Sequence, residues 1–192
     1  AVVSAAASSL SYSWANGGNP GGTQYRALVS TTSDFSGGSD ASSDTLNTTA
    51  AFASLLVNTT YYFKVKALGG LGPDSAFTAA VTSSTLANPP LTAAVAAVTP
   101  TTAQLSWAAN SNPSGTRYAA QLSTASNFSG TLSSSQTFGT LATFAGLTPN
   151  STYYLRVKAL GHGGAESTYA VASASATDAN APTAAVLLAA SA

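Results

Sequence analysis

The sequence predicts an all-β protein built from two tandem β-sandwiches. Apolar and polar residues alternate with a period of two, and clusters of turn-forming residues separate the short alternating runs. Long segments also recur at a spacing of 93 or 92 residues. Since about seven short strands in a repeat of roughly this length are typical of a β-sandwich, each repeat is expected to fold as one seven-stranded sandwich.

The repeat is clearest in its aromatic residues. Three of them recur 93 residues later: Trp14, Tyr25 and Phe35 as Trp107, Tyr118 and Phe128. The segment 58–69 recurs as 150–161, and the opening segment 88–95 recurs as 180–186. We therefore expect one domain over residues 1–88, a second over 89–180, and the first strand of a further repeat over 181–192.

The strands follow from the alternation. Tyr61, Phe63 and Val65 alternate with Lys64 and Lys66, which indicates a half-buried strand with its charges outward. The segments 10–14 and 103–107 alternate in the same way. Turns rich in Gly, Asn and Pro lie at 16–22, 69–74 and 110–115.

Three features together resemble fibronectin type III domains: a Trp in the second strand, a Tyr in the third, and a Leu-x-Pro-x-Ser/Thr-x-Tyr motif at 147–153. In the first repeat, Val57 replaces the Pro of this motif. The resemblance implies that Trp14 and Trp107 lie in the cores, and that Tyr61 and Tyr153 form tyrosine corners bonded to backbone near the preceding turn. The Ser/Thr-rich stretches ending in Asp/Asn-Phe-Ser are further similar to repeats in large secreted bacterial surface proteins.

Composition excludes several classes of protein. Charged residues make up 6% of the chain, six basic and six acidic, and the net charge is zero. Such a chain lacks the basic footprint of nucleic-acid binding, and it has no apolar run of the ~20 residues that span a membrane. Without Cys it has neither disulfides nor thiolate metal sites. It also lacks an initiator Met and a leader, and is therefore expected to be a mature or excised piece.

The sequence offers little to build a catalytic site. Its single His, His162, lies in a predicted loop where the first repeat has Gly70, so an exposed loop residue is favoured over a general base. Asp34, Asp40 and Asp44 lie close in sequence, but the second repeat has no matching acidic cluster, so a solvated loop is favoured over a calcium site. We therefore predict no enzyme activity and no catalytic, cofactor-binding or metal-binding residues.

Four Asn residues lie in Asn-x-Ser/Thr sequences and are candidate N-glycosylation sites. They are Asn47, Asn58, Asn127 and Asn150. Asn58 and Asn150 occupy the same turn in the two repeats, where Asn and its Ser/Thr neighbours also favour the turn itself.

The favoured function is that of a non-enzymatic extracellular or cell-surface structural protein, in which end-to-end sandwiches build a fibre, stalk or sheath. One alternative is an adhesion module that presents loops to cells or glycans. The outward Tyr62 and Tyr154, with Lys64 and Arg156 beside them, are its candidate contact patch. A second alternative is a spacer from a secreted polysaccharide-degrading enzyme. No cofactor is implied.

The expected partner is the protein itself, as a head-to-tail homopolymer or a longer covalent array. The segment that starts with Ala185, Val186, Leu187 and Leu188 repeats the opening strand of a sandwich but has no further sandwich behind it. Either the native chain continues, or this strand docks on the first domain of another copy by strand addition. Asn88-Pro89-Pro90 leaves almost no free linker, so the two domains are expected to form a stiff rod.

Overall fold

The structure is a computed structural model that describes residues 1–184, all of it strands, turns and loops. No helix long and apolar enough to cross a bilayer occurs in this range. The strands of the first sandwich are β1 (Val2–Ala5), β2 (Leu10–Ser13), β3 (Tyr25–Ser30), β4 (Ala41–Thr45), β5 (Thr49–Phe52), β6 (Thr60–Ala67) and β7 (Val81–Ser84). Those of the second are β8 (Leu91–Val98), β9 (Thr102–Ala108), β10 (Arg117–Ser123), β11 (Thr131–Thr137), β12 (Leu141–Ala145), β13 (Thr152–Leu160), β14 (Ala170–Val171) and β15 (Ser175–Ala176).

The two sandwiches have the same antiparallel topology. In the first, a sheet ordered β1-β2-β5 faces a sheet ordered β4-β3-β6-β7. In the second, β8-β9-β12 faces β11-β10-β13-β14, and β15 also pairs with β13. The two short strands β14 and β15 together take the place that β7 has in the first sandwich, so the predicted pair of seven-stranded β-sandwiches is confirmed.

Each sandwich has its own core. Alternate residues of the central strands are buried, as in β6 and β13. Tyr12 stacks on Phe63 with ring centroids 4.2 Å apart in the first core. Trp107 is buried in the second core, whereas Trp14 packs against the first core but stays partly exposed. The expectation of two core indoles is therefore met fully by Trp107 and in part by Trp14.

Both tyrosine corners form. The hydroxyl of Tyr61 accepts a hydrogen bond from the backbone N–H of Leu56 at 2.9 Å. The hydroxyl of Tyr153 accepts one from Thr148 at 3.0 Å. Each bond satisfies the phenol of a buried ring and fixes the turn that precedes the strand.

Aromatic rings cover the charged side chains on the outer sheet face. The Lys64 ammonium lies 3.7 Å from the ring centroid of Phe35 and 4.7 Å from that of Phe77. In the second sandwich, the Arg156 guanidinium lies at 4.0 Å from Phe128 and 3.9 Å from Tyr169. The Phe of each Asp/Asn-Phe-Ser stretch thus folds back over the sheet and makes a cation–π contact, which explains its recurrence in the repeat.

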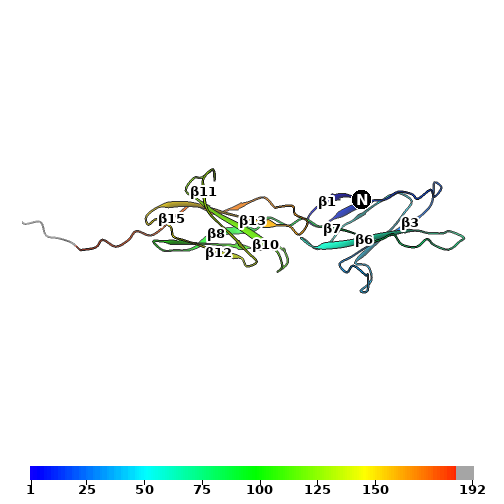
Figure 1. Cartoon of the computed structure of the whole chain (residues 1–192), viewed down its shortest axis with the longest axis horizontal. Coiled ribbons are helices and arrows are strands. Elements are labelled where there is room, and N and C mark those ends of the chain that lie inside the picture. Colours follow the sequence, from blue (N-terminus) through cyan, green and yellow to red (C-terminus); the bar gives the residue numbers. More distant parts are fainter. Residues whose placement is uncertain (185–192) are drawn as a thin grey trace, which may run out of the picture.

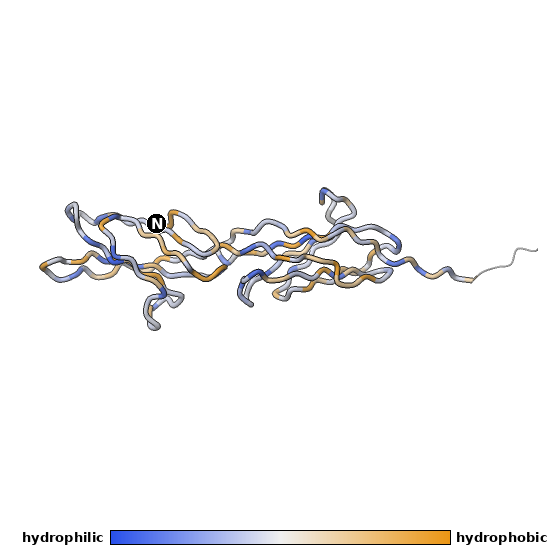
Figure 2. The backbone as a smooth tube through the Cα atoms, turned by 180° about the vertical axis from the view of Figure 1, so that it is seen from behind, coloured by the Kyte–Doolittle hydropathy of each residue, from blue (hydrophilic) through white to orange (hydrophobic). Residues whose placement is uncertain are grey.

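The sandwiches lie end to end, as the proline-rich linker predicts (Figure 1). Seen from behind, the same elongated shape is pale over most of its length, since most residues are neither strongly hydrophilic nor strongly hydrophobic (Figure 2). The sandwiches meet through their end loops, and hydrogen bonds between these loops help to set how the sandwiches are oriented.

Candidate functional site

The joint between the sandwiches is the most highly organised site in the described part of the chain. We define the joint by five residues: Asn58 and Ser84 of the first sandwich, and Thr116, His162 and Gly163 of the second. Asn58 lies in the turn before β6, Ser84 ends β7, and the other three belong to the loops next to β10 and β13. These segments meet in the middle of the rod (Figure 1).

Asn58 is the centre of the joint. Its amide Nδ2 donates to the Thr116 hydroxyl at 2.8 Å, and its Oδ1 accepts from the backbone N–H of His162 at 2.8 Å. Asn58 and Thr116 are both 0% exposed, so the bond between them is shielded from water, whereas the bond to His162 is partly buried. The Asn58 backbone has φ of 46°. Asn tolerates this left-handed conformation better than most residues, and the turn uses it to aim the amide at the second sandwich.

Small residues allow the loop at 161–164 to approach the first sandwich. A Cβ atom added to Gly163 would lie 3.4 Å from the Ser84 Cβ, and one added to Gly161 would lie 2.4 Å from the Ala165 carbonyl oxygen of its own loop. Any side chain at Gly161 would therefore clash with backbone, and one at Gly163 would press on β7. The glycines keep this loop compact enough to present the His162 N–H to Asn58.

The linker is held by the second sandwich. The Asn88 N–H donates to Asn112 Oδ1 at 2.9 Å, and the Asn112 Nδ2 donates back to the Asn88 carbonyl at 2.8 Å. The Asn110 Nδ2 donates to the Pro89 carbonyl at 2.8 Å. Together with the restricted φ of Pro89 and Pro90, these bonds leave the linker little freedom to bend.

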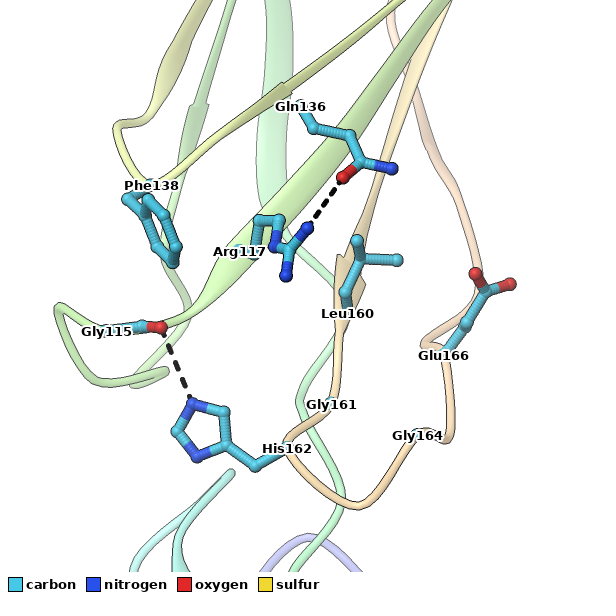
Figure 3. Close-up of a pocket in the computed structure, with 9 residues that line it drawn as sticks. All are labelled: Gly115, Arg117, Gln136, Phe138, Leu160, Gly161, His162, Gly164 and Glu166. Carbon is cyan, nitrogen blue, oxygen red and sulfur yellow. Dashed lines mark hydrogen bonds between the residues drawn. The ribbon is translucent and has the colours of Figure 1, made fainter.

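A shallow hollow beside the joint gathers His162, Arg117 and Glu166 (Figure 3). The His162 ring lies 3.5 Å from the Gly115 carbonyl oxygen, and Arg117 donates to Gln136 at 3.0 Å. Glu166 lies across the hollow from His162 and pairs with Lys158, which raises the pKa of that lysine. The nine residues that line this hollow include no Ser, Thr or Asp.

The acidic residues of the first sandwich have separate local partners. The Asp34 carboxylate accepts from the Ser36 N–H at 3.0 Å, which lowers its pKa. Asp40 accepts from the Thr31 N–H at 2.5 Å. Asp44 pairs with Arg26 at 2.6 Å, and the hydrogen bond from that guanidinium lowers the Asp44 pKa. Among the described residues, no three His, Cys, Asp or Glu side chains gather as metal ligands do.

The four candidate glycosylation sites lie in different surroundings. Asn47, Asn127 and Asn150 are exposed. Asn58 is fully buried, and a glycan on its Nδ2 would require the joint to open. Ala185, Val186, Leu187 and Leu188, the candidate assembly strand, lie outside the described residues.

Sequence reasoning missed the joint. Asn58 and Asn150 share one motif, and only the neighbouring sandwich distinguishes them. The available signal was Thr116 in the segment Asn-Pro-Ser-Gly-Thr at 112–116, which repeats Asn-Pro-Gly-Gly-Thr at 19–23.

The fold and the joint together define a protein of two tandem β-sandwiches. The model of the fibronectin type III domain matches residues 88–174, which identifies the second sandwich as a domain of this family. The first sandwich shares its topology and its repeat sequence. No curated protein matches the chain.

Solved structures of tandem fibronectin type III domains are similar to this chain. A two-domain segment of chicken tenascin has a TM-score of 0.61 and 18% sequence identity, and the match covers 92% of this chain and 97% of that one. The FN1–FN3 segment of chicken CNTN1 has a TM-score of 0.42 and 16% identity, over 93% of this chain and 66% of that one. The first likeness shows the shared tandem fold. Fibronectin type III domains are general structural or binding modules, typically non-catalytic, and they commonly occur in extracellular or cell-surface proteins.

Proposed function

We propose that the chain is a non-enzymatic extracellular structural protein and the building block of a surface fibre, stalk or sheath. The observation that carries this proposal is the joint. Asn58 holds the two sandwiches end to end through one buried and one partly buried hydrogen bond, and the linker is held at Asn88. A rod with a fixed joint keeps its length and direction, which are the properties that a fibre subunit requires.

The surface supports the same proposal. Lys64 and Arg156 are covered by aromatic rings, and the carboxylates of Asp44 and Glu166 are paired with basic groups. The outer face therefore presents few free charges to a substrate or a ligand. A neutral surface of this kind also gives weak repulsion between copies, which favours self-association.

Assembly through the segment that starts at Ala185 meets one obstacle. Val2–Ala5 already pairs with β2 and occupies the place of the opening strand in the first sandwich. A docking strand from another copy must displace β1 or add beside it at the edge of the sheet. A contact between the ends of the rods avoids this competition, and a longer covalent array remains the other arrangement that satisfies the proposal.

Electron microscopy of the purified chain over a range of concentrations tests the proposed function. We expect straight, unbranched filaments whose repeat equals the length of two sandwiches. Dispersed or randomly aggregated chains at every concentration, together with freely bent two-domain particles, would contradict a role as a fibre subunit.

A further inference from the structure

The two free ends of the rod carry the same surfaces as the two sides of the joint. We call the end formed by the loops at 16–23 and 69–75 the head; its equivalents in the second sandwich are 109–116 and 161–167. We call the end formed by the turn at 148–151 and the segment 175–178 the tail; its equivalents in the first sandwich are 56–59 and 83–86. The joint is a tail of the first sandwich on a head of the second. Among residues 1–184, one head and one tail are left uncovered at opposite ends of the rod (Figure 1).

The free tail keeps the geometry of the tail in the joint. Asn150 has φ of 50° and its N–H donates to the Asp178 carbonyl at 3.1 Å, as Asn58 has φ of 46° and donates to Leu86 at 3.2 Å. Thr177 braces the turn by donating to Thr148 at 2.6 Å, as Thr85 does to Leu56. Within residues 1–184 the Asn150 side chain is exposed and bonds to no other group.

The free head keeps the geometry of the head in the joint. The Thr23 N–H donates to Pro20 at 3.3 Å, as Thr116 does to Pro113 at 2.9 Å. Asn19 donates through Nδ2 to the Asn16 carbonyl at 2.6 Å, which is the bond that Asn112 makes in the second sandwich.

Two groups on this head are ready to bond. Asn112 Oδ1 accepts the N–H of linker residue Asn88. In the free head, Asn19 Oδ1 is the equivalent acceptor, and it has no partner among the described residues. The Gly70 N–H takes the place of the His162 N–H, and it too has no partner among them. The free head thus has an acceptor for a linker and a donor for an Asn side chain.

Two positions carry different side chains in the joint and at the free ends, and at the free ends both of these side chains are apolar. In the joint, Gly163 approaches Ser84. The free head has Leu71 at the position of Gly163, and Leu71 is fully exposed at 110% relative accessibility, the most exposed large hydrophobic residue described. The free tail has Ala176 at the position of Ser84. Ala176 lacks the serine hydroxyl but keeps its Cβ, so the two ends must lie slightly farther apart than in the joint to accommodate the leucine. The contact between Leu71 and the apolar alanine would remove an isolated apolar side chain from water.

We propose that a second copy of this chain docks its head on this tail, with the Asn150 side chain bonded to Thr23 and Gly70 of the copy and Ala176 covered by its Leu71. This proposal rests on the proposed function, because it names the surfaces by which the rods assemble. The contact joins two different surfaces, so it repeats along an axis and produces a filament.

Engineered disulfides test the contact, since the chain has no cysteine. The double variant Ser84→Cys with Gly163→Cys calibrates the geometry, because the two Cβ atoms would lie 3.4 Å apart and should close a bridge within one chain. The double variant Leu71→Cys with Ala176→Cys should instead give a ladder of covalent multimers on mild oxidation. Each single variant should stop at dimers. Absence of the ladder, with the internal bridge formed, would overturn the proposed contact.

Assembly measured by light scattering separates this proposal from the proposed function. Asn150→Ala and Leu71→Ser should each weaken association about tenfold or more, because each removes bonding or packing at the contact. Thr143→Ala, at an exposed position in the middle of β12 and away from both ends, should have no effect. If the unaltered chain forms filaments and both variants do so equally well, the proposed contact is wrong while the fibre role stands. If only deletion of residues 185–192 stops assembly, the terminal strand is the joint between copies. If the unaltered chain never assembles, both proposals fail.

Discussion

Replacing Asn58 with Ala should uncouple the two sandwiches. The change removes both hydrogen bonds of the joint. It leaves the buried Thr116 hydroxyl and the partly buried His162 N–H without these partners. A buried polar group left unsatisfied costs about 1–3 kcal/mol, and the partly buried His162 N–H should cost less than the buried Thr116 hydroxyl. The two together should therefore lower the coupling free energy by about 2–4 kcal/mol. Alanine at φ of 46° adds a strain of roughly 1–2 kcal/mol in the turn itself.

Asn150→Ala is the matched control. It carries the same left-handed strain at φ of 50° but loses no hydrogen bond within residues 1–184. In dilute solution, the difference between the two variants in the free energy of unfolding therefore isolates the joint.

Urea unfolding followed by circular dichroism gives these free energies, and hydrogen exchange of the His162 amide reports the joint directly. We expect Asn58→Ala to cost about 2–4 kcal/mol more than Asn150→Ala and to abolish protection of the His162 amide. Equal costs for both variants, with the amide still protected, would refute the argument that these bonds hold the rod straight.

Three further predictions concern the cores and the outer face. Trp107→Ala should lower the free energy of unfolding by about 3–5 kcal/mol, and Trp14→Ala should lower it by less because Trp14 is partly exposed. Urea denaturation measures both losses, and equal losses would contradict this order. Burial raises the pKa of Tyr12 to about 12, so its contribution to stability is complete below pH ~10 and falls by about 1.4 kcal/mol per pH unit between ~10 and ~12, where only the unfolded phenol ionises. Tyr12→Phe should flatten this alkaline loss in unfolding curves measured against pH, and an unchanged slope would contradict it. Phe35→Ala should destabilise the first sandwich by about 1 kcal/mol, because the ring contact with Lys64 is lost, whereas Phe35→Tyr should retain stability. An unchanged calorimetric unfolding midpoint in Phe35→Ala would contradict a stabilising role for this contact.

The fold was predictable because it depends on local patterns that repeat. The period of two placed Tyr61, Phe63 and Val65 inward, and the fibronectin-like motif placed the hydroxyl of Tyr61 against the preceding turn. The partial exposure of Trp14 was not predictable, since it depends on how far the loop at 16–22 covers the indole, and several conformations of this Gly-rich loop are compatible with the same sequence.

The candidate site was predictable only in part. The sequence marks Asn58 and Asn150 as equivalent, but in the structure Asn58 is buried and Asn150 is exposed. This difference depends on contacts with the next sandwich, which a repeat pattern does not encode. The recurrence of Phe35 as Phe128 was visible, yet the side chain folds back over Lys64, which requires the left-handed φ of 58° that a non-glycine residue rarely adopts. Long-range packing of this kind leaves no periodic signal in a single sequence.

All six basic residues of the chain lie inside strands: Arg26 in β3, Lys64 and Lys66 in β6, Arg117 in β10, and Arg156 and Lys158 in β13. Proteases of tryptic specificity cut after Lys and Arg, and they require a short extended segment that they can pull free of the fold. The exposed turns, which are the usual points of attack, contain no Lys or Arg in this chain. Cleavage therefore requires at least the strand that carries the basic residue to open, so the lifetime of the protein among such proteases is set by that opening equilibrium.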